Sequence, residues 1–316
     1  MTSVDELHAT LTRRFDGRVH RDELIGPFTT YRVGGAASLM VMVETDAELA
    51  AVAAATAAAG VPTLTIGKGS NLLVCDAGFP GLALRLGDAF ASIDIAGVVG
   101  DTTLVRAGGA ASLPVVARRT AAAALTGFEW AVGVPGSIGG AVRMNAGGHG
   151  SDMSAVLARI RVVDLATGED GVVPVDTLDL GYRSSAIRSD HVVSWAELAL
   201  RPGDRDRSED EIRGIVRWRR ANQPGGQNAG SVFANPPDDS AGRLIEAAGC
   251  KGLRIGSAQV SPKHANFIQA DPSGRADDVY ALMVEVRRRV HAATGVVLHN
   301  ENLLIGYSPL PEVEGS

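Results

Sequence analysis

Apolar residues recur along the chain with two different periods, which predict an alternation of helices and short strands. Between Val4 and Phe15 they lie three or four positions apart, a spacing that places them on one face of a helix. Short apolar runs bounded by glycine, proline or aspartate instead predict strands. The predicted strands are residues 30–33, 39–43, 62–66, 160–165, 171–175 and 192–200.

Capping residues predict where further helices begin and end. Thr45 and Ser240 stand where an N-cap side chain accepts a backbone hydrogen bond, and Ser208 with Glu211 fits a capping box. Gly60 and Gly295 stand where a glycine ends a helix. The predicted helices are residues 45–59, 112–125, 208–222, 240–249 and 275–294.

The length of 316 residues predicts two or three structural units, at about 100–200 residues each. The turn at 202–204 and the charged run DRDRSEDE after it indicate a boundary near residue 203. A hydrophobic content of 45% with 21% charged residues is typical of a soluble globular protein and excludes a disordered chain.

Charge and cysteine content argue against several classes of partner. The net charge is −6, and no basic cluster is interleaved with aromatics, so we expect no nucleic acid. No run approaches the ~20 apolar residues of a membrane span, and the N-terminus has no apolar signal core. We therefore expect a cytoplasmic protein without membrane insertion. Cys75 and Cys250 have no metal-ligand spacing, so we expect no metal and two reduced thiols.

Two glycine-rich stretches stand out, GKGSN at 67–71 and GVPGSIGGAVRMNAGGHG at 133–150. Glycine admits positive φ angles and lets backbone N–H groups approach anionic oxygens such as those of a pyrophosphate. Neither stretch is a GxGxxG turn between a strand and a helix, and no Walker A sequence is present. The pattern favours a dinucleotide cradle of another kind, and a set of ordered surface turns is the alternative.

Four isolated polar residues are candidates for chemistry. Arg183 in GYRSS is either a clamp for a carboxylate or phosphate or an exposed surface arginine. Ser231 in NAGSVFANP lacks the Gly-x-Ser-x-Gly elbow of a serine hydrolase and is either a turn residue or a functional hydroxyl. Glu301 is either an edge charge or a partly buried functional acid, and His264 is either a ligand or a packed histidine.

Seven motifs in order resemble the UDP-N-acetylenolpyruvoylglucosamine reductases (UDP-N-acetylmuramate dehydrogenases), in particular the shorter forms that lack an extra tyrosine-bearing loop. The resemblance covers nearly the whole chain. The motifs are TYRVGGAA at 30–37, GKGSNLLV at 67–74, the stretch 127–150, GYRSS at 181–185, NAGSVFANP at 228–236, the stretch 240–268 and ENLLIG at 301–306.

The resemblance implies an α+β fold with a vanillyl-alcohol-oxidase-type FAD-binding domain of two subdomains and a C-terminal α+β substrate domain. The expected divisions are a lead-in at 1–24, the FAD-binding domain at 25–203 with subdomains 25–85 and 86–203, the substrate domain at 204–309 and a tail at 310–316. The implied reaction is NADPH-dependent reduction, through FAD, of UDP-N-acetylglucosamine enolpyruvate to UDP-N-acetylmuramate in peptidoglycan precursor synthesis. We expect a monomer.

The resemblance also implies residue roles. Ser231 matches the proton donor, and Arg183 and Glu301 match residues that stabilise the enolic intermediate. Arg183, Asn235 and His264 are expected to bind substrate. The residues expected to bind FAD are Tyr31, Arg32, Gly67, Lys68, Gly69, Ser70, Asn71, Leu72, Gly133, Val134, Pro135, Gly136, Ser137, Gly139, Gly140, Asn145 and Gly147.

Three positions depart from the family pattern. Ala234 stands where a lysine is expected, Leu303 where an arginine is expected and His149 where a tyrosine is expected. They leave open a paralogue that reduces a related enolpyruvyl nucleotide. A flavin-dependent oxidase of the same fold and a catalytically silent nucleotide-sugar binder are further alternatives, but neither has a use for Arg183, Ser231 and Glu301 together.

Overall fold

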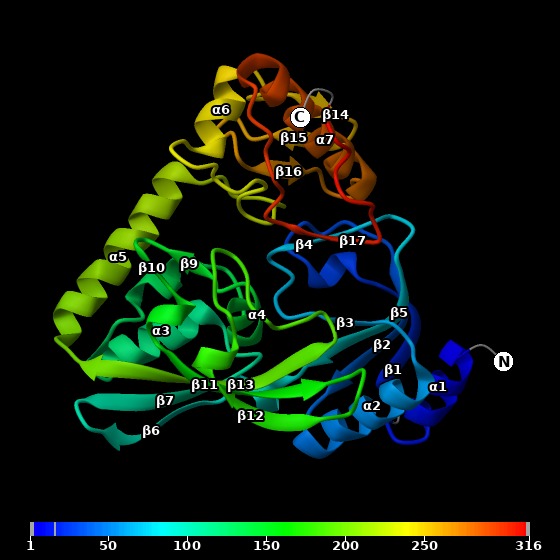
Figure 1. The fold of residues 1–316 in the computed structure, drawn as a ribbon, viewed down its shortest axis with the longest axis vertical. Helices are drawn as coiled ribbons and strands as arrows, with labels where there is room; N and C mark the ends of the chain where they lie inside the picture. The colour runs from blue at the N-terminus through cyan, green and yellow to red at the C-terminus, as the bar shows by residue number, and fades with distance from the viewer. Residues whose placement is uncertain (1–2, 16, 314–316) are drawn as a thin grey trace. The chain divides into compact units, whose positions relative to one another are not determined.

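The computed structural model describes residues 3–15 and 17–313, which form two compact units (Figure 1). Unit 1 consists of Met1–Arg21, Ser38–Lys68 and Pro80–Arg219, and unit 2 of Asp22–Ala37, Gly69–Phe79 and Arg220–Ser316. The units are compact bodies rather than continuous segments, so the domain boundaries expected from the sequence remain predictions. No helix in the described part of the chain combines the length and apolar character needed to cross a membrane.

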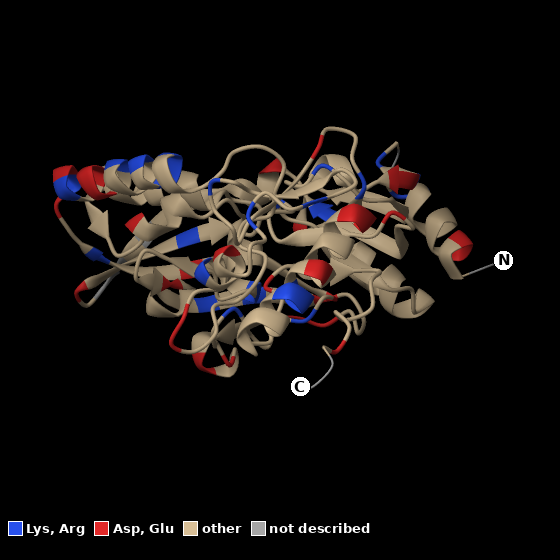
Figure 2. Cartoon of the chain, turned by 90° about the horizontal axis from the view of Figure 1, so that it is seen from above, with Lys and Arg blue, Asp and Glu red and all other residues tan. Residues whose placement is uncertain are grey.

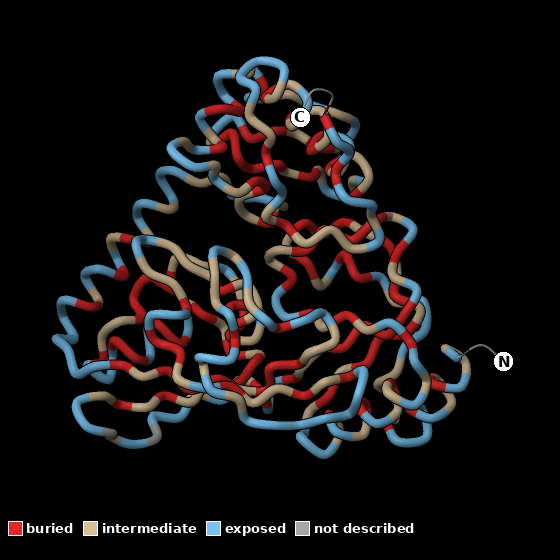
Figure 3. The backbone as a smooth tube through the Cα atoms, viewed as in Figure 1, coloured by how far each residue is buried: buried red, intermediate tan, exposed pale blue. Residues whose placement is uncertain are grey.

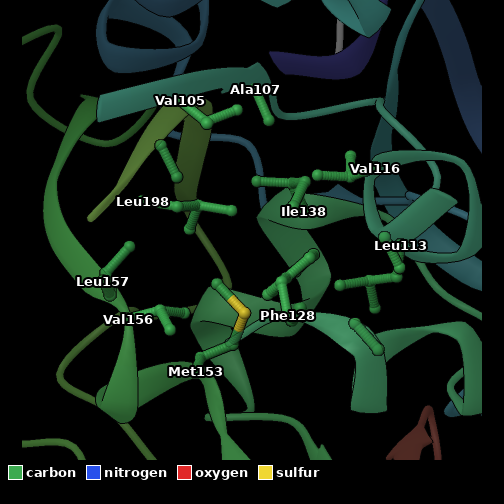
Figure 4. Packing of buried hydrophobic residues seen from close by; sticks show 14 of the residues in the cluster. Val105, Ala107, Leu113, Val116, Phe128, Ile138, Met153, Val156, Leu157 and Leu198 are labelled. Atoms are coloured by element: carbon green, nitrogen blue, oxygen red, sulfur yellow. The ribbon is translucent and has the colours of Figure 1, made fainter. Parts of the chain in front are cut away.

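An antiparallel sheet in unit 1 carries the main glycine-rich stretch on its surface. Val105, Ala107 and Leu198 from its central strands pack against Leu113 and Ile138 of the helices α3 and α4 (Figure 4). Most residues of the longest strand are buried (Figure 3). The elements are β6 (Ile93–Val99), β7 (Thr102–Gly108), β8 (Leu125–Thr126), β11 (Leu157–Asp164), β12 (Asp170–Pro174), β13 (His191–Pro202), α3 (Leu113–Ala122) and α4 (Ile138–Arg143), with sheet order β12-β11-β13-β7-β6 and β8 beside β13.

A second sheet, mostly in unit 1, has the order β1-β2-β5-β3 and packs against α1 and α2. The caps predicted for α2 are confirmed, because the Thr45 side chain accepts from the Glu48 N–H and Gly60 is left-handed, at φ 62°. The bounds are α1 (Ser3–Thr12), β1 (Val19–Leu24), β2 (Ala36–Val43), α2 (Asp46–Ala59), β3 (Thr63–Thr65) and β5 (Phe79–Leu86).

Unit 2 has a three-stranded antiparallel sheet and a parallel pair of short strands, β4 with β17. Its core includes Tyr31, Val33 and Leu73, although the other residues of this core lie at 229–310, far along the sequence. Ser240 caps α6 and Gly295 ends α7, as predicted. The bounds are β4 (Leu72–Val74), α6 (Ala241–Ala247), β14 (Arg254–Ile255), β15 (Ala258–Val260), β16 (Ile268–Ala270), α7 (Ala276–Thr294) and β17 (Leu303–Ile305).

The strand predicted at 30–33 is wrong. Tyr31 and Val33 are buried as a strand pattern requires, but Arg32 between them has φ 58°, outside the extended region. The Arg32 N–H donates to the Thr29 hydroxyl at 3.1 Å, so the segment is a turn that follows the short 3₁₀ helix Gly26–Phe28. Burial of alternate residues here comes from the turn and not from a sheet.

The capping box predicted at Ser208 is also wrong. The helix α5 (Arg205–Asn222) begins one turn earlier, where the Asp204 carboxylate accepts from the Arg207 N–H at 2.8 Å. Ser208 lies inside the helix, and its hydroxyl donates to the buried Glu129 carboxylate at 2.6 Å. The exposed face of α5 carries charges of both signs (Figure 2), as a solvated helix face does.

We expect Ser208→Ala to lower the free energy of unfolding by about 1.5–3 kcal/mol at neutral pH, the range for a hydrogen bond to a charged group. Burial raises the pKa of Glu129, but hydrogen bonds from Ser208, Thr126 and the Gly127 N–H outweigh burial and leave the pKa below its usual value. Such a carboxylate stabilises the fold above its ordinary pKa, and this contribution is lost as the pH falls through its folded-state pKa. Denaturant unfolding should therefore show the variant approaching the wild type in acid. A deficit that stays constant with pH would mean that Ser208 acts through packing alone.

Candidate active site

The glycine-rich loop 133–140 in unit 1 leads from the 3₁₀ helix Glu129–Gly133 into α4. The first N–H groups of α4 are already bonded to protein: the Ile138 N–H donates to the Ala111 carbonyl at 2.9 Å, and the Gly139 N–H donates to the Gly109 carbonyl at 2.9 Å. These two donors hold the loop on the segment that follows β7. The N–H groups that the loop is expected to offer to an anion are therefore those of its other residues.

The two glycine-rich stretches touch each other in unit 1. A Cβ on Gly67 would lie 2.3 Å from the Ser137 hydroxyl oxygen, so glycine allows this approach without rotation of the serine side chain. Ser137 is 3% exposed, whereas Gly67 and Lys68 are exposed. The bare Cα of Gly67 thus serves contact between the loops, and the exposed Lys68 ammonium follows directly after it.

Arg183 is tied to the same glycine-rich stretch. One of its guanidinium nitrogens, Nη2, donates to the Gly147 carbonyl at 3.0 Å, and the guanidinium carbon lies 5.2 Å from the centre of the Tyr182 ring. Asn145, which is 3% exposed, donates to the Gly181 carbonyl at 2.9 Å. The stretch 145–147 and the segment 181–183 are therefore held together by side-chain to backbone bonds within unit 1.

Ser231 and Glu301 lie on two neighbouring segments of unit 2. The Glu301 N–H donates to the Val232 carbonyl at 2.8 Å, and Phe233 forms a β-bridge with Asn300. The Ser231 side chain is half-buried, and its hydroxyl has no hydrogen bond to the described residues. The structure thus brings two of the three expected catalytic residues together, and Arg183 belongs to the other unit.

The second part of the GKGSN motif, residues 69–71, belongs to unit 2. Gly69 has φ 59°, and a Cβ there would lie 2.4 Å from the Phe28 carbonyl oxygen, so glycine is required at this position. The Asn71 side-chain amide donates to the Glu301 carbonyl at 3.1 Å. A residue expected to bind the cofactor and a residue expected in catalysis are therefore in direct contact.

Tyr31 and Arg32, both expected to bind FAD, make internal contacts in unit 2. Tyr31 is fully buried, and burial raises the pKa of its phenol far above the usual value. A guanidinium nitrogen of Arg32 donates to the Pro27 carbonyl at 2.7 Å. These contacts show how the turn is held, and the roles of both residues toward FAD remain predictions.

Asn235 and His264, expected to bind substrate, also have structural partners. The Asn235 side-chain oxygen accepts from the Ala241 N–H at 3.0 Å, at the start of α6. His264 Nδ1 accepts from the Asn266 N–H at 3.3 Å, and burial lowers the pKa of the ring, which favours neutral imidazole. Their contacts with substrate stay predictions.

Asn302, in the same region, was not predicted from the sequence. It is 1% exposed, and its amide nitrogen lies within hydrogen-bond distance of oxygens of Asn71, Ala229 and Ser231. Its position next to Glu301 is the signal that could have pointed to it. A buried amide needs partners, and the partners of this one come from two separate motifs, GKGSN and NAGSVFANP.

Family models match two regions of the chain. The model for the C-terminal domain of UDP-N-acetylenolpyruvoylglucosamine reductase matches residues 222–305, and an FAD binding domain model matches residues 37–170. The second match spans both glycine loops. The α+β fold and the FAD-binding domain expected from the sequence are thereby confirmed.

Whole-chain comparisons agree with these matches. UDP-N-acetylenolpyruvoylglucosamine reductase 2 of Symbiobacterium thermophilum is 41% identical over 298 residues, which are 94% of this chain and 95% of that protein. The reductase of Heliobacterium modesticaldum is 40% identical over 94% of both chains. The crystal structure of the reductase from Thermus caldophilus has a TM-score of 0.79 at 35% identity and covers 91% of this chain and 99% of its own. The chain therefore belongs to the UDP-N-acetylenolpyruvoylglucosamine reductase family.

Proposed function

We propose that this protein reduces UDP-N-acetylglucosamine enolpyruvate to UDP-N-acetylmuramate, with FAD as bound cofactor and NADPH as the source of the hydride. One observation carries the proposal. In a chain of this family, Ser231 and Glu301 lie on bridged segments, the Ser231 hydroxyl has no hydrogen bond to the described residues, and Asn71 of the glycine loop contacts Glu301.

The residues of unit 1 fit a nucleotide cofactor. Gly67 and Ser137 bring two glycine loops into contact, and exposed Lys68 supplies a positive charge beside them. Trp130, in the segment that leads into loop 133–140, has a buried Nε1 donor with no hydrogen-bond partner among the described residues. A buried donor without a hydrogen-bond partner costs free energy, so we assign the Trp130 Nε1 donor to the cofactor region. When bound, FAD supplies the hydride transfer from the nicotinamide to one carbon of the substrate alkene.

The chain's own residues supply the proton and the electrostatic support. Reduction of the enol ether adds a hydride to one alkene carbon and a proton to its neighbour, and Ser231 donates that proton. A serine hydroxyl is a very weak acid, so the accepting carbon must have carbanion character. Arg183 polarises the substrate carboxylate, and Glu301 supports the enolic intermediate by hydrogen bonding or proton donation. The proton that leaves Ser231 is replaced from solvent.

Ala234 and Leu303 favour a second candidate function, that of a paralogous reductase. Both stand where the family pattern has a cation, and fewer cations weaken the binding of a diphosphate. A paralogous reductase of a related enolpyruvyl nucleotide would need the same cofactor and the same proton donor. The preference for NADPH, the monomeric state and the cytoplasmic location remain predictions.

An anaerobic experiment tests the proposal. We expect NADPH to bleach the flavin band of the purified protein, and UDP-N-acetylglucosamine enolpyruvate to restore the band rapidly. A band that NADPH bleaches and this substrate leaves bleached would contradict the substrate assignment and favour the paralogue. A protein that takes up no FAD would contradict the whole proposal.

A further inference from the structure

The side chain of Asn302 joins three segments of unit 2. Its amide nitrogen donates to the side-chain oxygen of Asn71 at 2.9 Å, to the Ala229 carbonyl at 3.0 Å and to the Ser231 carbonyl at 3.2 Å. An amide has two N–H hydrogens, so one of them is shared between two of these acceptors. A single buried group thus contacts the glycine loop and the backbone of the expected proton donor.

Asn71 returns the contact. Its side-chain nitrogen donates to the Glu301 carbonyl at 3.1 Å, and its own carbonyl accepts from the Leu303 N–H at 2.8 Å. Asn71 and Asn302, here termed the asparagine clamp, therefore bond each other and the residues on both sides of Asn302. Ser231 and Glu301 are attached to the glycine loop through these two amides.

The asparagine at position 302 has a cost as well as a gain in stability. Its side-chain oxygen is buried and has no hydrogen-bond partner among the described residues, which costs free energy. Leucine has a similar size and avoids this cost. What leucine cannot do is donate to three oxygens at once, so the amide serves the geometry that these bonds define.

We propose that Asn302 is a positioning residue that sets the place of the Ser231 hydroxyl relative to residues 69–71 of the glycine loop. This inference rests on the proposed function. The proton-transfer step needs the hydroxyl within hydrogen-bond reach of one substrate carbon, whereas reduction of the flavin by NADPH involves neither Ser231 nor Glu301. Loss of the asparagine clamp should therefore slow reoxidation of the flavin by the substrate and leave its reduction by NADPH unchanged.

Two variants of Asn302 separate positioning from folding. In Asn302→Leu the donor is absent, and we expect flavin reoxidation by the enolpyruvyl substrate to slow roughly 10–100-fold, as displacements near 1 Å do. Flavin reduction by NADPH should stay within about twofold of the wild type, because uniform structural damage would lower both rates together. Both rates are measured by anaerobic stopped-flow absorbance on the holoenzyme.

The Asn302→Asp variant adds a pH signature. Its carboxylate would face three oxygens in a buried site, and burial and repulsion raise the pKa of such a group. When protonated it regains an O–H donor. We therefore expect the ratio of variant to wild-type reoxidation rates to rise as the pH falls. At pH values above the raised pKa, the ratio should rise about tenfold for each unit by which the pH is lowered. Merely structural damage gives a ratio that does not change with pH.

Ser257→Ala is the matched control, because the Ser257 hydroxyl also makes hydrogen bonds in unit 2, but its partners are Asp278 and the Arg275 N–H. It should lose thermal stability and keep both rates. Reoxidation at the wild-type rate in Asn302→Leu, or equal loss in both half-reactions, would overturn the inference. A wild-type enzyme whose reduced flavin is not reoxidised by the substrate would instead overturn the proposed function, and the inference with it.

Discussion

Ser231→Ala is expected to slow reoxidation of the reduced flavin by the enolpyruvyl substrate ~10²-fold or more, on the scale of a lost general acid. The half-buried hydroxyl is free of hydrogen bonds to the described residues, so it is available to the substrate, and its removal breaks no hydrogen bond to those residues. Flavin reduction by NADPH should continue at nearly the wild-type rate. Anaerobic stopped-flow absorbance resolves the two half-reactions, and binding of the substrate to oxidised enzyme shows that the site is intact.

The control for this experiment is Ser240→Ala, which removes the cap of α6 in the same unit. That variant should lose roughly 1 kcal/mol of stability and keep both half-reactions. If Ser231→Ala lowered the two rates equally, the serine would be a structural turn residue. A full rate of reoxidation would assign the proton to another donor, with Glu301 the next candidate.

Gly109→Ala is expected to destabilise unit 1 by about 3 kcal/mol or more, at the upper end for overpacking. A Cβ at Gly109 would lie 1.9 Å from the Val193 carbonyl oxygen in β13. This oxygen is backbone in the middle of a sheet, so it cannot move aside as a flexible side chain does. The Gly109 carbonyl also accepts from the Gly139 N–H at 2.9 Å, so the displacement reaches the loop 133–140.

Thermal unfolding and FAD titration measure both consequences. We expect a melting temperature lowered by roughly 6–12 °C, at about 2–4 °C per kcal/mol for a protein of this size, together with weaker FAD binding. Gly214→Ala is the matched glycine substitution, because a Cβ there meets nothing within 4 Å in the helix α5. It should stabilise the protein by about 0.5–1 kcal/mol. Equal melting temperatures for the two variants would contradict the close approach at Gly109.

Elements fixed by local contacts were predictable from the sequence. Thr45 and Ser240 cap the helices they were assigned to, because an N-cap bond joins residues only three apart. Gly60 and Gly295 end helices for an equally local reason, since each adopts a left-handed conformation that other residues avoid. The family motifs likewise pointed to the FAD-binding fold before any contact was known.

Features fixed by distant contacts were not predictable in this way. Ser208 matched a capping pattern, but its partner Glu129 lies 79 residues away, and no local rule anticipates that bond. The role of Asn302 could not be predicted, because its partner Asn71 lies 231 residues away. Alternating burial around Arg32 imitated a strand, whereas its positive φ belongs to a turn. The motifs therefore indicated residues of the site, whereas their hydrogen-bond partners became known only from the structure.

The parallel pairing of β4 with β17 has a consequence for protein synthesis. Leu72 pairs with Leu303, so β4 leaves the ribosome 231 residues before its partner exists (303 − 72 = 231). At about 5–20 residues per second, the interval is roughly 10–50 s. During that time Leu73 and the buried Tyr31 lack most of the core that covers them in the folded protein. Unit 2 can therefore fold only after residues 303–305 have emerged, and the nascent chain must be kept from aggregation until then.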